Sequence, residues 1–164
     1  MDRGMTRRAA ALGTATFLVV PGTIAGLFPC LLTGWQVRHA PGLPVRIGGL
    51  CLVLGGTATL ASAFAKFVIE GIGTPAPIAP TQRLVVGGLY RYVRNPMYLA
   101  VVALISGQAM LLRDAGLLLY AGGVALTMHA FVVAYEEPTL RREFGADYAA
   151  YCRAVRRWLP RMRP

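Results

Sequence analysis

Charged residues are scarce in this 164-residue sequence, at 15%, and the chain has one lysine against 16 arginines. A soluble domain of ordinary composition carries about 25% charged residues. Hydrophobic residues reach 55%, the mean hydropathy is +0.53, and the apolar residues stand in long runs. The composition therefore disfavours an ordinary soluble domain and predicts an integral membrane protein, with residues 1–164 forming a single membrane domain.

Cysteine and histidine are also few, and neither is spaced for a structural or metal site. Cys30, Cys51 and Cys152 form no CxxC pair, and His39 and His129 stand far apart. Cysteines in apolar runs usually behave as small hydrophobic side chains. We therefore expect no disulfide framework and no bound metal.

Acidic residues number only seven, which leaves a formal net charge of +10. Such a balance is often typical of a nucleic-acid partner. In a membrane protein, however, arginines gather on the cytoplasmic side because of the topology rule and the anionic leaflet. The sequence therefore predicts a lipid bilayer as partner and no nucleic acid.

Four apolar runs are long enough, or nearly so, to cross a bilayer as helices. The Arg7-Arg8 pair before the first run resembles a signal-peptide start, but the run is too long for a simple signal core, which favours a retained helix. Arg113-Asp114 forms a tight break between the last two runs. The predicted fold is an all-α polytopic membrane bundle with spans at about 9–32, 47–69, 97–112 and 115–134.

The positive residues are divided unevenly between the two ends of these spans. Fourteen fall in the N-terminus, in the segment after the second span and in the tail, and three fall on the opposite side. The positive-inside rule places both termini in the cytoplasm. The preference for arginine over lysine is typical of a GC-rich bacterial genome, so we expect a bacterial cytoplasmic (inner) membrane.

The connector at 70–96 is the first of two polar stretches on the predicted cytoplasmic side. Its four prolines exclude a continuous helix, and Gly87-Gly88 marks a turn. A connector of this length without regular structure usually has a function. Its tyrosines and arginines are equally typical of residues that anchor a protein at the membrane interface.

The tail at 135–164 is the second stretch, and it opens with Glu136 and Glu137. If the fourth helix ends there, two carboxylates face an unfavourable helix dipole, at a cost of up to about 1 kcal/mol each. They either pair with tail arginines or wait for a ligand. From Thr139 the spacing of apolar residues predicts an amphipathic helix that Gly145 kinks or divides, and Trp158 is expected to anchor at the interface.

His129 lies seven residues before Glu136, on the same face of the fourth predicted helix. It either lines the same cavity as Glu136 or is a hydrogen-bonded structural residue. The sequence does not decide between these two interpretations of His129.

Two blocks of residues, in this order after apolar spans, resemble the isoprenylcysteine carboxyl methyltransferases and the related bacterial phospholipid-methyltransferase-like membrane proteins. The blocks are Leu84-Val85-x-x-Gly88-x-Tyr90-x-x-x-Arg94-Asn95-Pro96-x-Tyr98 and Glu136-Glu137-x-x-Leu140-x-x-x-Phe144-Gly145-x-x-Tyr148-x-x-Tyr151. The resemblance covers about residues 75–160. It implies methyl transfer from S-adenosylmethionine, leaving S-adenosylhomocysteine, inside a helical membrane domain.

The resemblance also implies a set of site residues. Arg94, Tyr98 and Glu136 are the implied catalytic residues, with Arg94 either orienting the acceptor or supporting the turn. The implied cofactor contacts are Gln82, Arg83, Leu84, Val85, Tyr90, Asn95, Pro96, Met97, Tyr98 and Glu136.

The chain departs from the family pattern at two positions. The eukaryotic enzymes have histidine where this chain has Asn95, whose amide both donates and accepts hydrogen bonds. The prenylcysteine enzymes carry an arginine where this chain has Val132. The second change argues against a prenylcysteine carboxylate and favours another small amphipathic or lipid-like acceptor.

Two other classes of function remain compatible with the sequence. One is a membrane scaffold that keeps the fold without catalysis, and the other is a lipid-binding or transport module that uses a lateral cavity. Binding of S-adenosylhomocysteine separates the enzyme from both alternatives.

Overall fold

The computed structural model describes residues 19–37, 39–70 and 84–161. The all-α prediction is confirmed, since no strand forms within these ranges. The first helix, 19–33, contains a π-helical turn, η1, followed by α2. The elements are η1 (Thr23–Leu27), α2 (Phe28–Thr33), α3 (Leu43–Glu70), the 3₁₀ turn η2 (Gly88–Arg91), α4 (Pro96–Leu112), α5 (Ala115–Phe131), the π-helical turn η3 (Val132–Glu136) and α6 (Glu137–Ala154).

The ends of the second and third helices differ from the sequence-based spans by only a few residues. The second span begins at Leu43 instead of residue 47, because Pro44 lies in the first turn, where no helical N–H is required. The third begins at Pro96 for the same reason. Of the first predicted span, residues 9–18 lie outside the described part of the chain.

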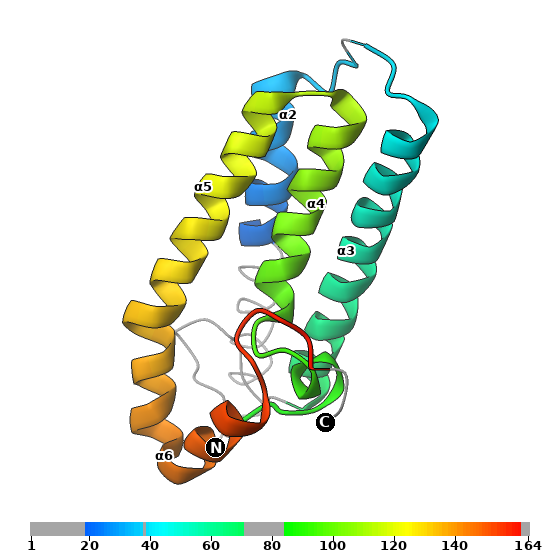
Figure 1. Cartoon of the computed structure of the whole chain (residues 1–164). Coiled ribbons are helices and arrows are strands. Elements are labelled where there is room, and N and C mark those ends of the chain that lie inside the picture. The colour runs from blue at the N-terminus through cyan, green and yellow to red at the C-terminus, as the bar shows by residue number, and fades with distance from the viewer. Residues whose placement is uncertain (1–18, 38, 71–83, 162–164) are drawn as a thin grey trace, which may run out of the picture.

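Helix α4 lies at the centre of the bundle, with α3 on one side and α5 on the other (Figure 1). The first helix packs against α4 and α5, and together they enclose the main core. This core consists of Ala25, Val101, Ile105, Ala109, Leu112, Leu117 and Ala121.

Helices α3 and α4 approach closely along a seam of small residues. A Cβ atom built on Gly107 of α4 would lie 2.8 Å from the backbone oxygen of Gly49 and 2.8 Å from Val53 of α3. About two turns further along α3, a Cβ atom built on Gly56 would lie 3.0 Å from the backbone oxygen of Ala100 on α4. Small residues that let backbones approach are the usual packing device of membrane helices, where the hydrophobic effect between helices is weak.

Both π-helical turns end two residues before a proline. Thr23–Leu27 precedes Pro29, and Val132–Glu136 precedes Pro138. A proline inside a helix has no N–H and its ring crowds the carbonyl four residues earlier. The wider π turn absorbs this conflict, so the helix continues through each proline instead of breaking.

Side chains from neighbouring helices bind two backbone carbonyls in the turn before Pro29. The Gln108 side-chain amide donates to the Ala25 carbonyl at 2.7 Å, and the Tyr120 hydroxyl donates to the Ile24 carbonyl at 2.9 Å. These oxygens stand four and five residues before Pro29, where an α- or π-type bond would otherwise form. These two hydrogen bonds therefore hold the irregular first helix against α4 and α5.

Replacing Gln108 by leucine or Tyr120 by phenylalanine is expected to lower the free energy of unfolding by about 1 kcal/mol each. In detergent this corresponds to a Tm lower by roughly 2–4 °C per variant. Thr127→Val is the matched control, because the Thr127 hydroxyl donates only within its own helix, to the Gly123 carbonyl. If both variants have the same Tm as Thr127→Val, the Gln108 and Tyr120 side chains do not stabilise the first helix.

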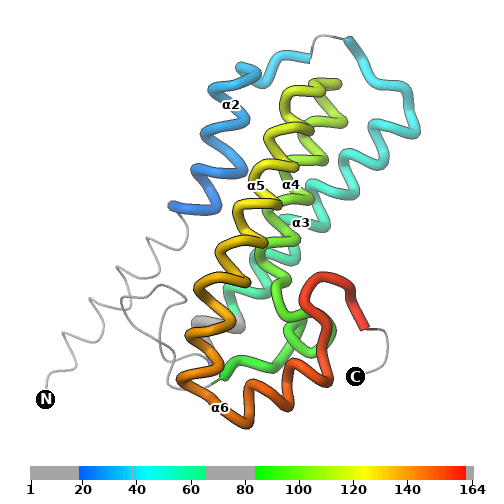
Figure 2. The backbone as a smooth tube through the Cα atoms, turned by 60° about the vertical axis from the view of Figure 1, so that its left-hand side comes forward, coloured from blue at the N-terminus to red at the C-terminus, as the bar shows by residue number. Residues whose placement is uncertain are grey.

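The helix that contains the fourth predicted span continues beyond residue 134. The helical segment Ala115–Ala154, 40 residues, continues from α5 through η3 into α6 and is interrupted only at Gly145. The expected dipole penalty at Glu136 and Glu137 was therefore wrong, because the π turn carries the helix past Pro138. The predicted irregularity at Gly145 is confirmed, since this residue has φ 47° and ψ −116° and divides α6 (Figure 2).

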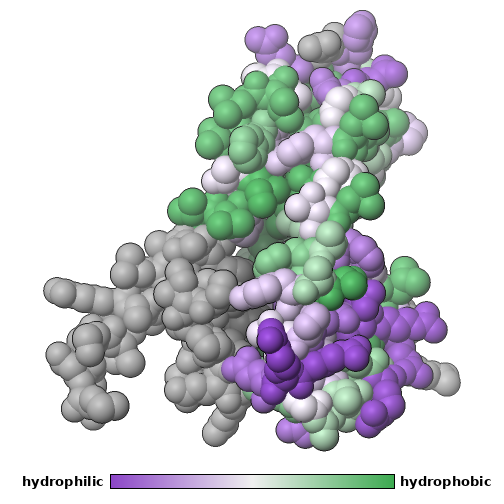
Figure 3. Space-filling view, turned by 90° about the vertical axis from the view of Figure 1, so that its left-hand side faces the viewer, coloured by the Kyte–Doolittle hydropathy of each residue, from purple (hydrophilic) through white to green (hydrophobic). Residues whose placement is uncertain are grey.

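Two of these helices are long and apolar enough to cross a membrane by length and composition. They are Leu43–Ala65 and Ala115–Ala154, with mean hydropathies of 1.7 and 1.9 in their most apolar windows. Only 17% of each window is buried inside the protein, whereas the core helix of a soluble domain is mostly buried. Since 40 residues are about twice what a bilayer requires, the polar helix α6 lies beyond the apolar part. Hydrophilic residues gather at the end that carries α6 (Figure 3).

Candidate active site

The segment after α6 returns along the connector. The helix ends at Ala154, and Val155 is extended instead of continuing the amphipathic helix predicted from Thr139. We call residues 155–161 the C-terminal strap. Its backbone pairs with the connector, since the Arg94 N–H donates to the Arg156 carbonyl and the Arg161 N–H to the Tyr92 carbonyl, both at 2.9 Å. The strap thus holds the start of α4 against the end of α6 (Figure 2).

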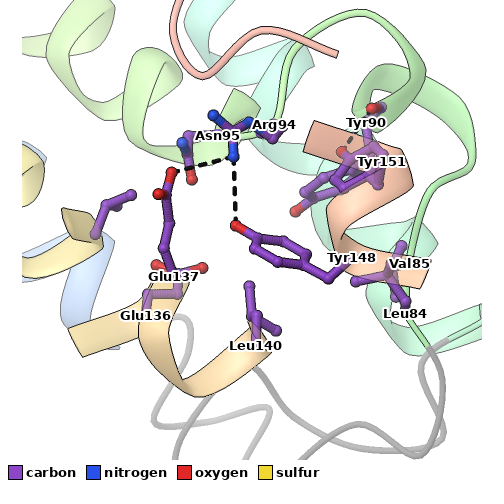
Figure 4. A pocket seen from close by; sticks show the side chains of 11 residues that line it. Leu84, Val85, Tyr90, Arg94, Asn95, Glu136, Glu137, Leu140, Tyr148 and Tyr151 are labelled. Carbon is purple, nitrogen blue, oxygen red and sulfur yellow. Dashed lines mark hydrogen bonds and ion pairs between the residues drawn. The ribbon is translucent and has the colours of Figure 1, made fainter. Parts of the chain in front are cut away.

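A cleft lies between the connector and the junction of η3 with α6 (Figure 4). Its empty volume is about 510 Å³, part of it open to solvent. Small-molecule sites commonly combine apolar walls with a few convergent polar groups. The cleft is lined by Leu84, Val85, Tyr90, Arg94, Asn95, Val132, Glu136, Glu137, Leu140, Tyr148 and Tyr151.

The two adjacent glutamates face different partners. The Tyr98 hydroxyl, from the first turn of α4, donates to Oε2 of Glu136 at 2.9 Å. Glu137 is 6% exposed and receives two hydrogen bonds from Arg157, Nε to Oε1 at 2.7 Å and Nη2 to Oε2 at 2.9 Å. Arg94 Nη1 lies 3.1 Å from the same Oε1. Glu137 is therefore neutralised by two arginines, whereas Glu136 lines the cleft as a carboxylate held by a neutral hydroxyl.

The charge state of Glu137 follows from these contacts. Burial by itself would raise the pKa of Glu137. The hydrogen bonds from Arg157 and the positive charges of Arg94 and Arg157 outweigh burial, so the pKa lies below its usual value. Glu137 is consequently ionised at neutral pH and acts as the anion of a buried ion-pair cluster.

Arg94 connects several walls of the cleft. Its Nη1 lies 2.7 Å from Sγ of Cys152 and 3.4 Å from the Tyr148 hydroxyl, in addition to its ion pair with Glu137 (Figure 4). Its Nε is buried and has no hydrogen-bond partner among the described residues. A buried donor without a partner costs about 1–3 kcal/mol, so a ligand oxygen at this point would be stabilised.

Asn95 and the tyrosines complete the wall opposite the glutamates. Asn95 is 7% exposed, and its Nδ2 donates to the Arg157 carbonyl at 3.2 Å. The Tyr151 hydroxyl donates to the Tyr90 carbonyl at 2.7 Å. Burial raises the pKa of both Tyr90 and Tyr151, so these phenols remain neutral and present aromatic faces.

The structure brings most of the sequence-predicted site residues to one place. Leu84, Val85, Tyr90, Arg94, Asn95 and Glu136 line the cleft, and Tyr98 touches it through Glu136. Pro96 and Met97 form the first turn of α4 beside it. Gln82 and Arg83 lie outside the described residues.

Sequence reasoning missed part of the site. Leu140, Tyr148 and Tyr151 line the cleft, although they were expected only as the apolar face of an amphipathic helix. Their spacing in the second motif block was the available signal. Arg157 is one of the tail arginines expected as a possible partner of the glutamates, but the sequence did not single it out, because it meets Glu137 only through the return of the strap.

His129 and Trp158 form a separate contact outside the cleft lining. The Trp158 indole N–H donates to Nδ1 of His129 at 3.0 Å, and the Trp158 ring lies 6.5 Å from that of Tyr98, centroid to centroid. The structural reading of His129 is therefore favoured over a cavity residue. Trp158 contacts Tyr98 of α4 and His129 of α5, and its anchoring at the membrane interface stays a prediction.

Residues 44–147 match a family model described as phospholipid methyltransferase. The match spans more than half of the chain and both motif blocks up to Asp147. The chain belongs to the phospholipid methyltransferase family. A comparison with curated proteins finds no match. The family, together with the membrane-spanning helices, makes the chain a membrane methyltransferase and confirms the resemblance seen in the sequence.

The family assignment gives the cleft its chemical context. A methyltransferase requires a methyl donor, and lipid-related acceptors are typical of a membrane family with this description. Among the described residues, no group of three or more histidine, cysteine or acidic side chains is placed to hold a metal ion.

Proposed function

We propose that the protein transfers a methyl group from S-adenosylmethionine to a small amphipathic or lipid-like acceptor, and that the cofactor binds in the cleft. The observation that carries this proposal is the contrast between the two glutamates. Glu137 is paired with Arg94 and Arg157, whereas Glu136 lines the cleft and receives, among the described residues, one side-chain hydrogen bond, from Tyr98.

The cleft residues suit the functional groups of this cofactor. Glu136 would accept charge-assisted hydrogen bonds from an ammonium group or from ribose hydroxyls. The buried Nε of Arg94 would donate to a carboxylate. Tyr90, Tyr148 and Tyr151 would offer aromatic faces to a cation, a contact of about 0.5–2 kcal/mol, while Leu84 and Val85 would contact the adenine.

When bound, the cofactor supplies an electrophilic methyl group on a sulfonium sulfur. The residues of the chain would then orient the two reactants and exclude water, because in-line displacement depends on alignment more than on a strong base. The aromatic and aliphatic side chains of the cleft would provide the desolvated surroundings. Arg94, bound to three different partners, would support the wall and direct the cofactor's carboxylate.

The acceptor would enter from the membrane side. The cleft lies where the apolar part of the 40-residue helix gives way to the polar α6, and Val132 is the apolar residue that faces it there. Because Val132 brings no positive charge, an acceptor bearing a free carboxylate at this point is disfavoured. We further propose that this end faces the cytoplasm, in line with the positive-inside rule.

Binding of S-adenosylhomocysteine to the purified protein in detergent tests the proposal. We expect the Tm to rise with ligand concentration. At a ligand concentration 100 times the Kd, binding should add about 2.7 kcal/mol to the free energy of unfolding. Labelled methyl transfer from S-adenosylmethionine into a bacterial lipid extract should follow. No stabilisation by S-adenosylhomocysteine at millimolar concentration would instead favour a non-catalytic scaffold or a lipid-binding module.

A further inference from the structure

Arg157 touches both walls of the cleft without lining it. Its guanidinium binds Glu137 on α6 through two parallel hydrogen bonds, at 2.7 and 2.9 Å. Its own carbonyl accepts a hydrogen bond from Nδ2 of Asn95, on the connector, at 3.2 Å. One residue of the strap therefore joins two segments that are 42 positions apart in the sequence.

The two attachment points flank the cofactor-facing groups. Glu137 follows Glu136 directly, and Asn95 stands between Arg94 and the first turn of α4, which carries Tyr98. Tyr98 and Glu136 meet at 2.9 Å across the same gap. A change in the separation of the two walls would consequently move the Glu136 carboxylate relative to Arg94 and Tyr98.

We infer that Arg157 is a positioning residue for the cofactor cleft: it fixes the spacing between the α6 wall and the connector wall, and so sets the affinity for the cofactor. This inference rests on the proposed function of the cleft. The family match ends at residue 147, so the strap that carries Arg157 lies beyond the matched segment.

The chemistry of the contact explains why an arginine serves this purpose. A guanidinium binds a carboxylate through two parallel bonds in a fixed plane, which fixes orientation as well as distance. A lysine ammonium can neutralise Glu137 but makes no such planar fork. Arg94 already supplies a positive charge at 3.1 Å, so the contribution special to Arg157 is geometric.

The test measures two quantities for the wild type and for variants of Arg157. Calorimetry in detergent gives the Kd for S-adenosylhomocysteine, and methyl-transfer assays give KM and kcat separately. For Arg157→Ala we expect Kd and the KM for S-adenosylmethionine to rise by about 10-fold or more, with kcat changed less than 3-fold. Arg157→Lys should recover only part of the affinity. Arg156→Ala, at the neighbouring and exposed arginine, should bind like the wild type.

A second control separates positioning from stability. Gly107→Ala disturbs the α3–α4 seam away from the cleft and should lower the Tm without changing Kd. If Arg157→Ala behaves in the same way, with a lower Tm and a Kd within 2-fold of the wild type, the inference is overturned. If Arg157→Ala cannot be purified folded, the same comparison on Arg157→Lys and Arg157→Gln decides it.

The wild-type measurement distinguishes this inference from the proposed function. Wild-type protein that binds no S-adenosylhomocysteine overturns both. Wild-type binding that is lost in Glu136→Ala but retained in all the Arg157 variants leaves the proposed function standing and removes only the role of Arg157.

Discussion

Replacing Glu136 by alanine is expected to weaken S-adenosylhomocysteine binding by roughly 10- to 100-fold while the protein remains folded. A hydrogen bond to a charged group contributes about 1.5–3 kcal/mol, and each 1.4 kcal/mol is a factor of ten in Kd. Glu136 has one described side-chain partner, the Tyr98 hydroxyl, so its removal disturbs few other contacts. Calorimetry in detergent gives the Kd, and thermal unfolding gives the integrity of the fold.

Three companion variants make the Glu136 result specific. Glu143→Ala removes an exposed glutamate of α6 and should leave the Kd unchanged. Glu136→Gln keeps the shape but loses the charge, and should fall between wild type and alanine. Tyr98→Phe removes only the hydroxyl, so its effect should be smaller than that of Glu136→Ala. Unchanged binding by Glu136→Ala would exclude Glu136 from the site.

Replacing Gly107 by valine is expected to be the most damaging single change to the bundle. A Cβ at this position would lie 2.8 Å from the backbone oxygen of Gly49, which cannot move aside as a flexible side chain can. The two helices must then separate or shift, at a cost of about 3 kcal/mol. The Tm in detergent should fall by roughly 10 °C, or the protein should fail to be recovered as a monodisperse species.

Gly55→Val is the matched control for this variant. Gly55 is exposed on α3, and a Cβ there meets no described atom within 4 Å. Both substitutions introduce the same β-branched residue into a helix, so the difference between them reports the packing of α3 on α4 alone. Equal Tm values for Gly107→Val and Gly55→Val would show that the seam is not tightly packed in solution.

The membrane architecture could be predicted because it depends on local sequence. A run of about 20 apolar residues forms a helix in lipid, because every backbone N–H and C=O group must then find its hydrogen-bond partner within the segment. The Arg113-Asp114 break, which was predicted, acts over a few residues, and so does Pro96 at the start of α4, one residue before the predicted span. The end of the fourth helix was not predicted, because a π turn upstream allows Pro138 to stay within the helix.

The candidate site was predicted unevenly for the same reason. Motif residues on the connector and at the end of α5 could be named in advance, since two ordered blocks identify a family. The parts contributed by α6 and the strap could not, because Tyr148 and Arg157 reach the cleft only after the chain turns back at Gly145 and Ala154.

The sequence by itself determined that this chain forms apolar helices with its chemistry gathered at one end, because helix formation in lipid and charge distribution are properties of contiguous residues. Only the tertiary structure decided which of two neighbouring carboxylates pairs with arginines and which lines the cleft beside a tyrosine hydroxyl. Glu136 and Glu137 are chemically identical, but they bind different partners. Glu136 binds Tyr98, which is 38 positions away in the sequence, and Glu137 binds Arg157, which is 20 positions away. Those partners meet them because of the rotation of the helix through η3 and the return of the strap, neither of which is encoded within a single local window.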